Sequence, residues 1–159
     1  MNDLENSYPI FEKLDSQRKI ATNLLTDWYD KARDNQVVNE SDLYNIHLFL
    51  AGRGWGKTLT GAYDTVQYCL ENRGVVCGVI APTYGDLKRV VFAGDSGFIN
   101  IIEPELLSTT GYNKSDNEIH FYNGSKIIGF PAIEPDRLRG VQFHRAWCDE
   151  LASWRYRET

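Results

Sequence analysis

The chain has 159 residues, of which 42% are hydrophobic and 25% charged, a balance that suits one globular domain and excludes a collagen-like, coiled-coil or disordered chain. Its net charge of -5 lacks the basic surplus of a stand-alone nucleic-acid binder, so contact with DNA must be local or made by another segment. The sequence contains no apolar run near the roughly 18 residues that span a bilayer.

The first predicted element is a helix over residues 16–31, where Ile20, Leu24 and Trp28 recur at four-residue steps. The apolar run 46–50 predicts a buried strand that ends in a glycine-rich loop. A helix over residues 57–72, a strand over 75–80 and a helix over 84–92 follow. This order predicts an α/β fold with a mainly parallel sheet flanked by helices.

An antiparallel hairpin insert is expected next. Residues 118–122 and 125–130 flank Asn123 and Gly124, a pair that supplies the two positive-φ residues of a type I′ turn. A short strand over residues 146–148 precedes an acidic pair, and a helix is expected from Leu151. The chain is therefore divided into an N-terminal helical segment, residues 1–45, and an α/β core, residues 46–159.

The strongest functional signal is the glycine-rich run before the second helix, the pattern of a P-loop NTPase. Glycines let backbone N–H groups curl around a phosphate, and the helix start adds its positive dipole end. Lys57 brings a full charge to the β- and γ-phosphates, and Thr58 offers a hydroxyl to Mg²⁺. Ala51 stands where the usual motif has glycine. The predicted nucleotide-binding residues of the loop are Gly52, Arg53, Gly54, Trp55, Gly56, Lys57 and Thr58.

Two side chains within this loop leave alternatives open. Arg53 is either a solvated loop residue or an arginine finger that neutralises charge developing on the γ-phosphate. Trp55 either packs on the domain or contacts a partner.

Asp149 and Glu150 follow the last apolar segment. In nucleoside triphosphatases such a pair completes the site, because the aspartate holds Mg²⁺ and the glutamate polarises the attacking water. A helix N-terminus with well-placed acidic residues is the simpler alternative, and the loop upstream favours the catalytic one. Thr58 and Asp149 are thus the predicted metal ligands, and Glu150, Arg53 and Lys57 the predicted catalytic residues.

Several blocks over about residues 28–156 resemble the ATPase domain of the large subunit of tailed-phage DNA-packaging terminases. Residues 28–36 are similar to the family's W-x3-A-R-x2-Q segment and residues 50–58 to its L-G-G-R-G-x-G-K-T loop, while the most specific block runs over 134–156. The resemblance implies an ATP- and Mg²⁺-dependent ATPase in which Gln36, joined by Arg33, recognises adenine.

The resemblance also implies a motor that drives viral double-stranded DNA into a procapsid. Its implied partners are the portal protein, the small terminase subunit and further copies of itself in a ring, in the host cytoplasm with no membrane. The family's threonine-rich coupling motif and nuclease domain are expected beyond Thr159. The 159-residue chain is therefore expected to be an incomplete core, marginally stable and weakly active.

Other functions with the same loop chemistry are a helicase-like or repair ATPase, a small-molecule kinase, and an inactive nucleotide-binding assembly module. Sequence beyond Thr159 would distinguish a helicase-like or repair ATPase from a packaging motor. Substitution of Glu150 would separate a hydrolase from a module that only binds.

Overall fold

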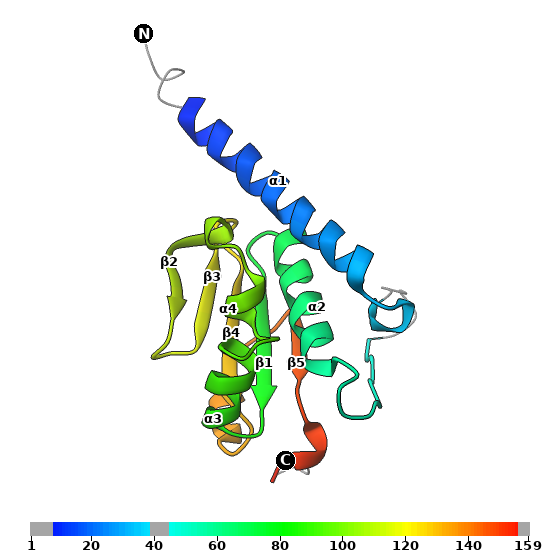
Figure 1. The fold of residues 1–159 in the computed structure, drawn as a ribbon. Coiled ribbons are helices and arrows are strands. Elements are labelled where there is room, and N and C mark those ends of the chain that lie inside the picture. Colours follow the sequence, from blue (N-terminus) through cyan, green and yellow to red (C-terminus); the bar gives the residue numbers. More distant parts are fainter. Residues whose placement is uncertain (1–7, 39–44, 156–159) are drawn as a thin grey trace.

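The computed structural model describes residues 8–38 and 45–155. A five-stranded sheet has the order β2-β3-β4-β1-β5 (Figure 1). Its strands are β1 (Val76–Ala81), β2 (Leu107–Asn113), β3 (Glu118–Phe121), β4 (Lys126–Pro131) and β5 (Arg145–Cys148). The helices are α1 (Tyr8–Lys31), α2 (Lys57–Glu71), α3 (Tyr84–Asp86) and α4 (Phe98–Ile101), with a π-helical segment η2 (Leu87–Phe92). Four 3-10 turns are η1 (Asp34–Gln36), η3 (Pro104–Leu106), η4 (Pro135–Leu138) and η5 (Leu151–Ser153).

The sheet is mixed rather than mainly parallel. β1 lies between β4 and β5 and pairs with both in parallel, whereas β2–β3 and β3–β4 are antiparallel. The α/β order and the hairpin of β3 and β4 are therefore confirmed. The prediction of a mainly parallel sheet is wrong because the insert adds two antiparallel pairings and the run 46–50 adds no parallel one.

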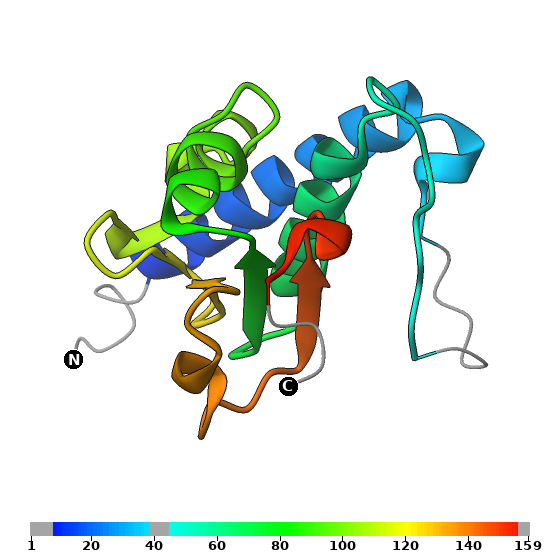
Figure 2. The ribbon, with the colours of Figure 1, turned by 90° about the horizontal axis from the view of Figure 1, so that it is seen from below.

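Two apolar layers hold the sheet. On one face α2 lies over the central strands, with α1 and α4 packed against it (Figure 2), and Ala62, Val66 and Cys69 of α2 are fully buried with Cys77 and Val79 of β1. On the other face, the connection from β4 to β5 covers a smaller cluster around Ile80 and Phe130. This double cover buries β1 on both sides, as a central strand of apolar residues requires.

The helix α1 begins at Tyr8, upstream of the predicted start at residue 16. Its periodic apolar face is confirmed, because Leu24 and Trp28 are buried and the Trp28 ring stacks on Tyr63 of α2 at 4.2 Å between centroids. A tertiary contact near the predicted start also holds the helix, since Gln17 Nε2 donates to the Glu105 carbonyl at 2.8 Å. Apolar spacing alone gave no signal for that polar contact.

The turn between β3 and β4 differs from the type I′ prediction. Only Gly124 has a positive φ, at 86°, and the Gly124 N–H donates to the Phe121 carbonyl at 3.1 Å. This pattern belongs to a longer hairpin connection with a left-handed glycine. The Asn123 side chain is used elsewhere, because its Nδ2 donates to the Cys69 carbonyl at 2.7 Å and ties the hairpin to α2.

The predicted strand over residues 46–50 is wrong. This segment forms no strand, and Ile46, Leu48 and Leu50 are 85%, 70% and 86% exposed. Figure 2 shows the segment (cyan) standing apart from β5, outside the sheet. A strand needs a partner for its backbone groups, and within the described residues the segment 46–50 has none, because β1 pairs with β4 and β5 instead.

Two predicted helices are shorter or different in the structure. The stretch 84–92 is one turn of α3, capped by the Thr83 hydroxyl, which continues as the π-helical segment η2. The helix expected from Leu151 is the 3-10 turn η5 within the described residues. By contrast α2, β1 and β5 match their predicted ranges to within one residue.

Candidate nucleotide-binding site

The glycine-rich loop curls as the sequence predicts. Gly54 and Gly56 have φ values of 79° and 94°, a backbone conformation that side chains other than hydrogen disfavour. Gly56 caps the start of α2, and its carbonyl accepts the Thr60 N–H at 2.9 Å. The positive end of α2 therefore opens at the loop, where Lys57 and Thr58 occupy the first helical turn.

The Lys57 ammonium folds back across this loop. Its Nζ donates to the carbonyl oxygens of Ala51 at 3.0 Å and Gly52 at 3.3 Å. Arg53, which follows Gly52 in the chain, is exposed. Lys57 is thus held at the mouth of the loop by oxygen acceptors that a phosphate oxygen can replace.

Arg33 and Gln36 contact the loop from the N-terminal segment. Gln36 is buried, its Nε2 donates to the Trp55 carbonyl at 3.0 Å, and Arg33 Nη2 donates to the same oxygen. Gln36 Oε1 accepts from both the backbone N–H and Nε of Arg33, at 3.1 and 3.2 Å. The Trp55 ring lies 5.7 Å from both the Arg33 guanidinium and the Phe49 ring centroid. These residues fix the loop, and the adenine contact implied by the resemblance remains a prediction.

Asp149 lies at the carboxyl end of β5 and is 5% exposed. Its backbone N–H donates to the Ile80 carbonyl at 2.8 Å, which continues the pairing of β5 with β1. Burial raises the pKa of Asp149 to about 6, and the Glu150 carboxylate also raises it. The Glu150 N–H, which donates to this carboxylate, and the Lys57 ammonium lower it. The charge of the loop lysine therefore acts on the strand carboxylate, while Lys57 Nζ itself donates to the Ala51 and Gly52 carbonyls.

Glu150 has a different environment from its neighbour. It is exposed and has a φ of 47°, a left-handed conformation uncommon for a side-chain-bearing residue. Trp154 Nε1 donates to the Asp149 carbonyl at 2.9 Å and so closes the turn that carries Glu150. The fold thus separates a buried acid from an exposed one at the same edge of the sheet.

Asp86 is a further acidic residue of this edge, and the sequence did not single it out. Its negative charge raises the pKa of Asp149. Thr83 orients it, because the Thr83 hydroxyl donates to Asp86 Oδ2 at 2.6 Å and accepts the Asp86 N–H at 3.1 Å. The available signal was topological, since β1 and β5 run parallel and the residues after each strand meet at one edge.

The donor set suits Mg²⁺ together with nucleotide phosphates. Hydroxyl and carboxylate oxygens are ligands that Mg²⁺ prefers, and Thr58 and Asp149 offer one of each. Within the described residues no three His, Cys, Asp or Glu side chains gather into a site that could hold a metal by themselves. Mg²⁺ commonly uses one or two protein ligands and completes its shell with water and phosphate, so these residues fit it.

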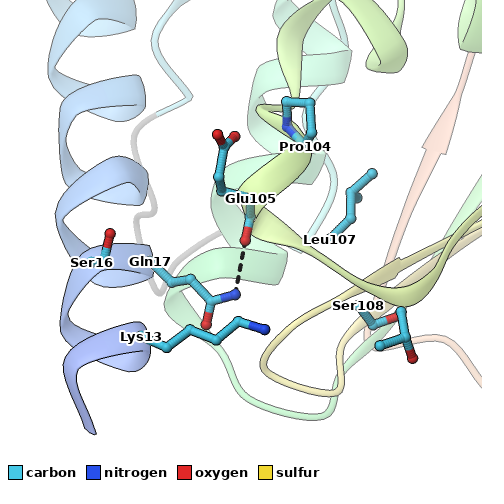
Figure 3. Close-up of a pocket in the computed structure, with 8 residues that line it drawn as sticks. Lys13, Ser16, Gln17, Pro104, Glu105, Leu107 and Ser108 are labelled. Carbon is cyan, nitrogen blue, oxygen red and sulfur yellow. Dashed lines mark hydrogen bonds between the residues drawn. The ribbon is translucent and has the colours of Figure 1, made fainter. Parts of the chain in front are cut away.

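A separate cavity of about 440 Å³ lies between α1 and the start of β2 (Figure 3). It is lined by Lys13, Ser16, Gln17, Pro104, Glu105, Leu107, Ser108 and Thr109. None of these residues belongs to the loop or the acidic pair. The Gln17–Glu105 hydrogen bond crosses this cavity and joins α1 to η3.

The loop, Asp149 and Glu150 all fall within one family match. The family described as the N-terminal part of the terminase large subunit, T4likevirus-type, matches residues 48–158. The chain belongs to this family. Membership gives the terminase chain a role in phage DNA packaging, with DNA and the capsid machinery. No curated protein and no solved structure matches it. Among residues 8–38 and 45–155, no helix is both long and apolar enough to cross a membrane.

Proposed function

We propose that this terminase chain binds and hydrolyses ATP with Mg²⁺, and that hydrolysis drives translocation of viral double-stranded DNA into a procapsid. The observation that supports the proposal best is that α2, which begins at Lys57, packs against β5, which ends next to the buried Asp149. These residues come from separate elements, the start of α2 and the end of β5. A cation that suits phosphate and an anion that suits a metal therefore lie at the ends of two elements that pack together.

Each residue then has a definite role in binding. The N–H groups of the curled loop donate to the phosphates, and Lys57 Nζ exchanges the Ala51 and Gly52 carbonyls for phosphate oxygens. Thr58 and Asp149 would hold Mg²⁺, which when bound supplies charge neutralisation at the β- and γ-phosphates. Arg33 and Gln36 keep the loop in place through the Trp55 carbonyl, on the side where adenine is expected.

The catalytic roles fall to the exposed side chains. Glu150 accepts a proton from the attacking water as the water oxygen bonds to the γ-phosphorus and the bond from that phosphorus to the β,γ-bridging oxygen breaks, so that ADP leaves with the electron pair. Arg53 neutralises the charge that develops on the transferred group, as an arginine finger does. Their exposure suits groups that must reach a substrate lying over the loop.

The remaining parts of the proposal concern assembly. With a net charge of -5, the chain does not hold DNA by overall charge, so the grip on DNA comes from the assembled motor. The proposed assembly is a ring of copies on the portal protein, with the small terminase subunit and viral DNA, in the host cytoplasm. Each copy contributes one nucleotide site.

Substitution of Glu150 tests hydrolysis separately from binding. Glu150→Gln and Glu150→Ala should lower ATP turnover about 10²–10⁴-fold, because the water loses its general base. The affinity for ATP, measured by titration with a fluorescent analogue, should stay close to that of the parent chain. Turnover unchanged by both substitutions would contradict the role of Glu150. Binding without any turnover in the assembled packaging motor would favour a module that only binds nucleotide.

A further inference from the structure

We infer that Gly61 and Trp147 are positioning residues that set the spacing between the phosphate loop and the acidic pair. The inference rests on the proposed function and deepens it. In this inference, a close contact between α2 and β5 joins the two halves of the site. Neither residue belongs to the loop motif or to the acidic pair.

The Trp147 indole lies directly against the backbone of Gly61. A Cβ atom built on Gly61 would stand 2.3–2.6 Å from three indole atoms, Cε2, Nε1 and Cδ2. Gly61 lies inside α2 and its φ is not positive, so the backbone conformation does not require glycine. What requires glycine here is the close approach of the indole ring.

Both residues stand next to the parts of the site that they would position. Gly61 lies about one helical turn after Lys57 and Thr58, which begin α2. Trp147 lies on β5, two positions before Asp149. A change in the distance between Gly61 and Trp147 therefore moves the phosphate-binding end of α2 relative to Asp149.

Neighbouring side chains hold the half-buried indole against α2. The Phe98 ring of α4 contacts it edge-on, with centroids 5.9 Å apart and planes at 81°. Arg145, on the same side of β5 as Trp147, forms a salt bridge with Asp64 of α2 at 3.0 Å and lies 4.5 Å from the Tyr68 ring centroid. These contacts hold α2 and β5 as one unit, so a methyl group at Gly61 must separate the two elements.

The test is Gly61→Ala in the full chain, with ATP affinity measured in the presence and absence of Mg²⁺. Alanine is a better helix former than glycine, so the helix itself tolerates the change. Affinity without Mg²⁺ should stay within about 2-fold of the parent value, because the loop and α2 move together. The gain in affinity on adding Mg²⁺ should fall about 10-fold or more, because Thr58 and Asp149 no longer hold their spacing.

A second substitution provides rescue. Trp147→Leu alone should also lower the Mg²⁺ gain, because the spacer is lost, and Gly61→Ala with Trp147→Leu should lie closer to the parent than either single change. Gln67→Ala is the matched control on the same helix, since the Gln67 amide only bonds Glu71 of α2. If Gly61→Ala does not fold, Trp147→Leu and the double variant carry the test.

The outcomes separate this inference from the proposed function. A parent chain that binds ATP better with Mg²⁺, with a Gly61→Ala variant that does the same, overturns the positioning role alone. The same holds if Gly61→Ala lowers only the melting temperature, or if the double variant loses as much Mg²⁺ gain as the worse single variant. A parent chain without any ATP binding overturns the proposed function, and the positioning role with it.

Discussion

Asp149 is the residue whose environment departs most from that of an ordinary surface acid. It is buried at the end of β5, beside the like charges of Glu150 and Asp86, and the Lys57 ammonium offsets them only in part, so its pKa is raised to about 6. A carboxylate whose ionised form is destabilised by its surroundings is typical of functional sites. A bound cation would relieve this destabilisation.

The raised pKa of Asp149 predicts a pH-dependent stability. Between pH 4 and 6 the folded chain binds more protons than the unfolded chain, so the free energy of unfolding falls as pH rises through this window. Asp149→Asn removes this pH-dependent fall in the free energy of unfolding, because an amide does not ionise. Without nucleotide, urea unfolding at pH 7.5 should find the variant more stable than the parent by about 1–2 kcal/mol, with little difference at pH 4. A variant less stable than the parent at pH 7.5 would show that Asp149 is a stabilising charge.

Gln36 carries a second prediction at this scale. Its amide holds Arg33 and the Trp55 carbonyl, so Gln36→Ala releases the loop from the N-terminal segment. We expect the affinity for ATP and GTP to fall alike, by about 5–30-fold, the cost of one to two hydrogen bonds of about 1 kcal/mol each. Competition binding with both nucleotides is the measurement. A loss confined to ATP would instead support the adenine role that the resemblance implies.

Among the elements, those with an apolar face were predictable and those that depend on pairing were not. The four-residue spacing of Ala62, Val66 and Leu70 predicted α2, and an apolar run predicted β1, because each buries an apolar face. A short apolar run also predicted β5, whose residues are half-buried or exposed. The strand β2 was missed, since its sequence is polar and its pairing with β3 is irregular between Leu107 and Tyr112. Residues 46–50 have the composition of a strand but pair with no strand of the sheet, and composition cannot reveal which segments pair.

The exposed run 46–50 predicts self-association of the 159-residue chain. Ile46, Leu48 and Leu50 present apolar side chains to solvent, and within the described residues β5 pairs with β1 alone. Exposed apolar segments and open sheet edges favour association between copies. Leu48→Lys should lower the average mass measured by light scattering at high concentration, whereas Ile133→Lys, at a less exposed apolar position, should not. Equal masses for the parent and Leu48→Lys would contradict this account.

At the scale of the whole molecule, the sheet order joins the two motifs. Because β1 and β5 are parallel neighbours, Asp149 lies at the same edge of the sheet as Ala81. The helix α2 packs across these strands and begins at Lys57. The motifs predicted that Lys57 and Asp149 act at one nucleotide site, and this stays a prediction. They could not predict Asp86 or the contact of Gly61 with Trp147, because neither follows a motif and both arise from how the elements pack.

The central claim is that the loop and the acidic pair form a single nucleotide–metal site. The most direct measurement is ATP affinity with and without Mg²⁺ for the parent chain, Lys57→Ala, Asp149→Ala and the double variant. We expect Lys57→Ala to lose affinity under both conditions, Asp149→Ala to lose only the Mg²⁺ gain, and the effects of the two substitutions to be non-additive, because both residues act on one bound triphosphate. Additive effects, or an Asp149→Ala variant that keeps the full Mg²⁺ gain, would contradict the account.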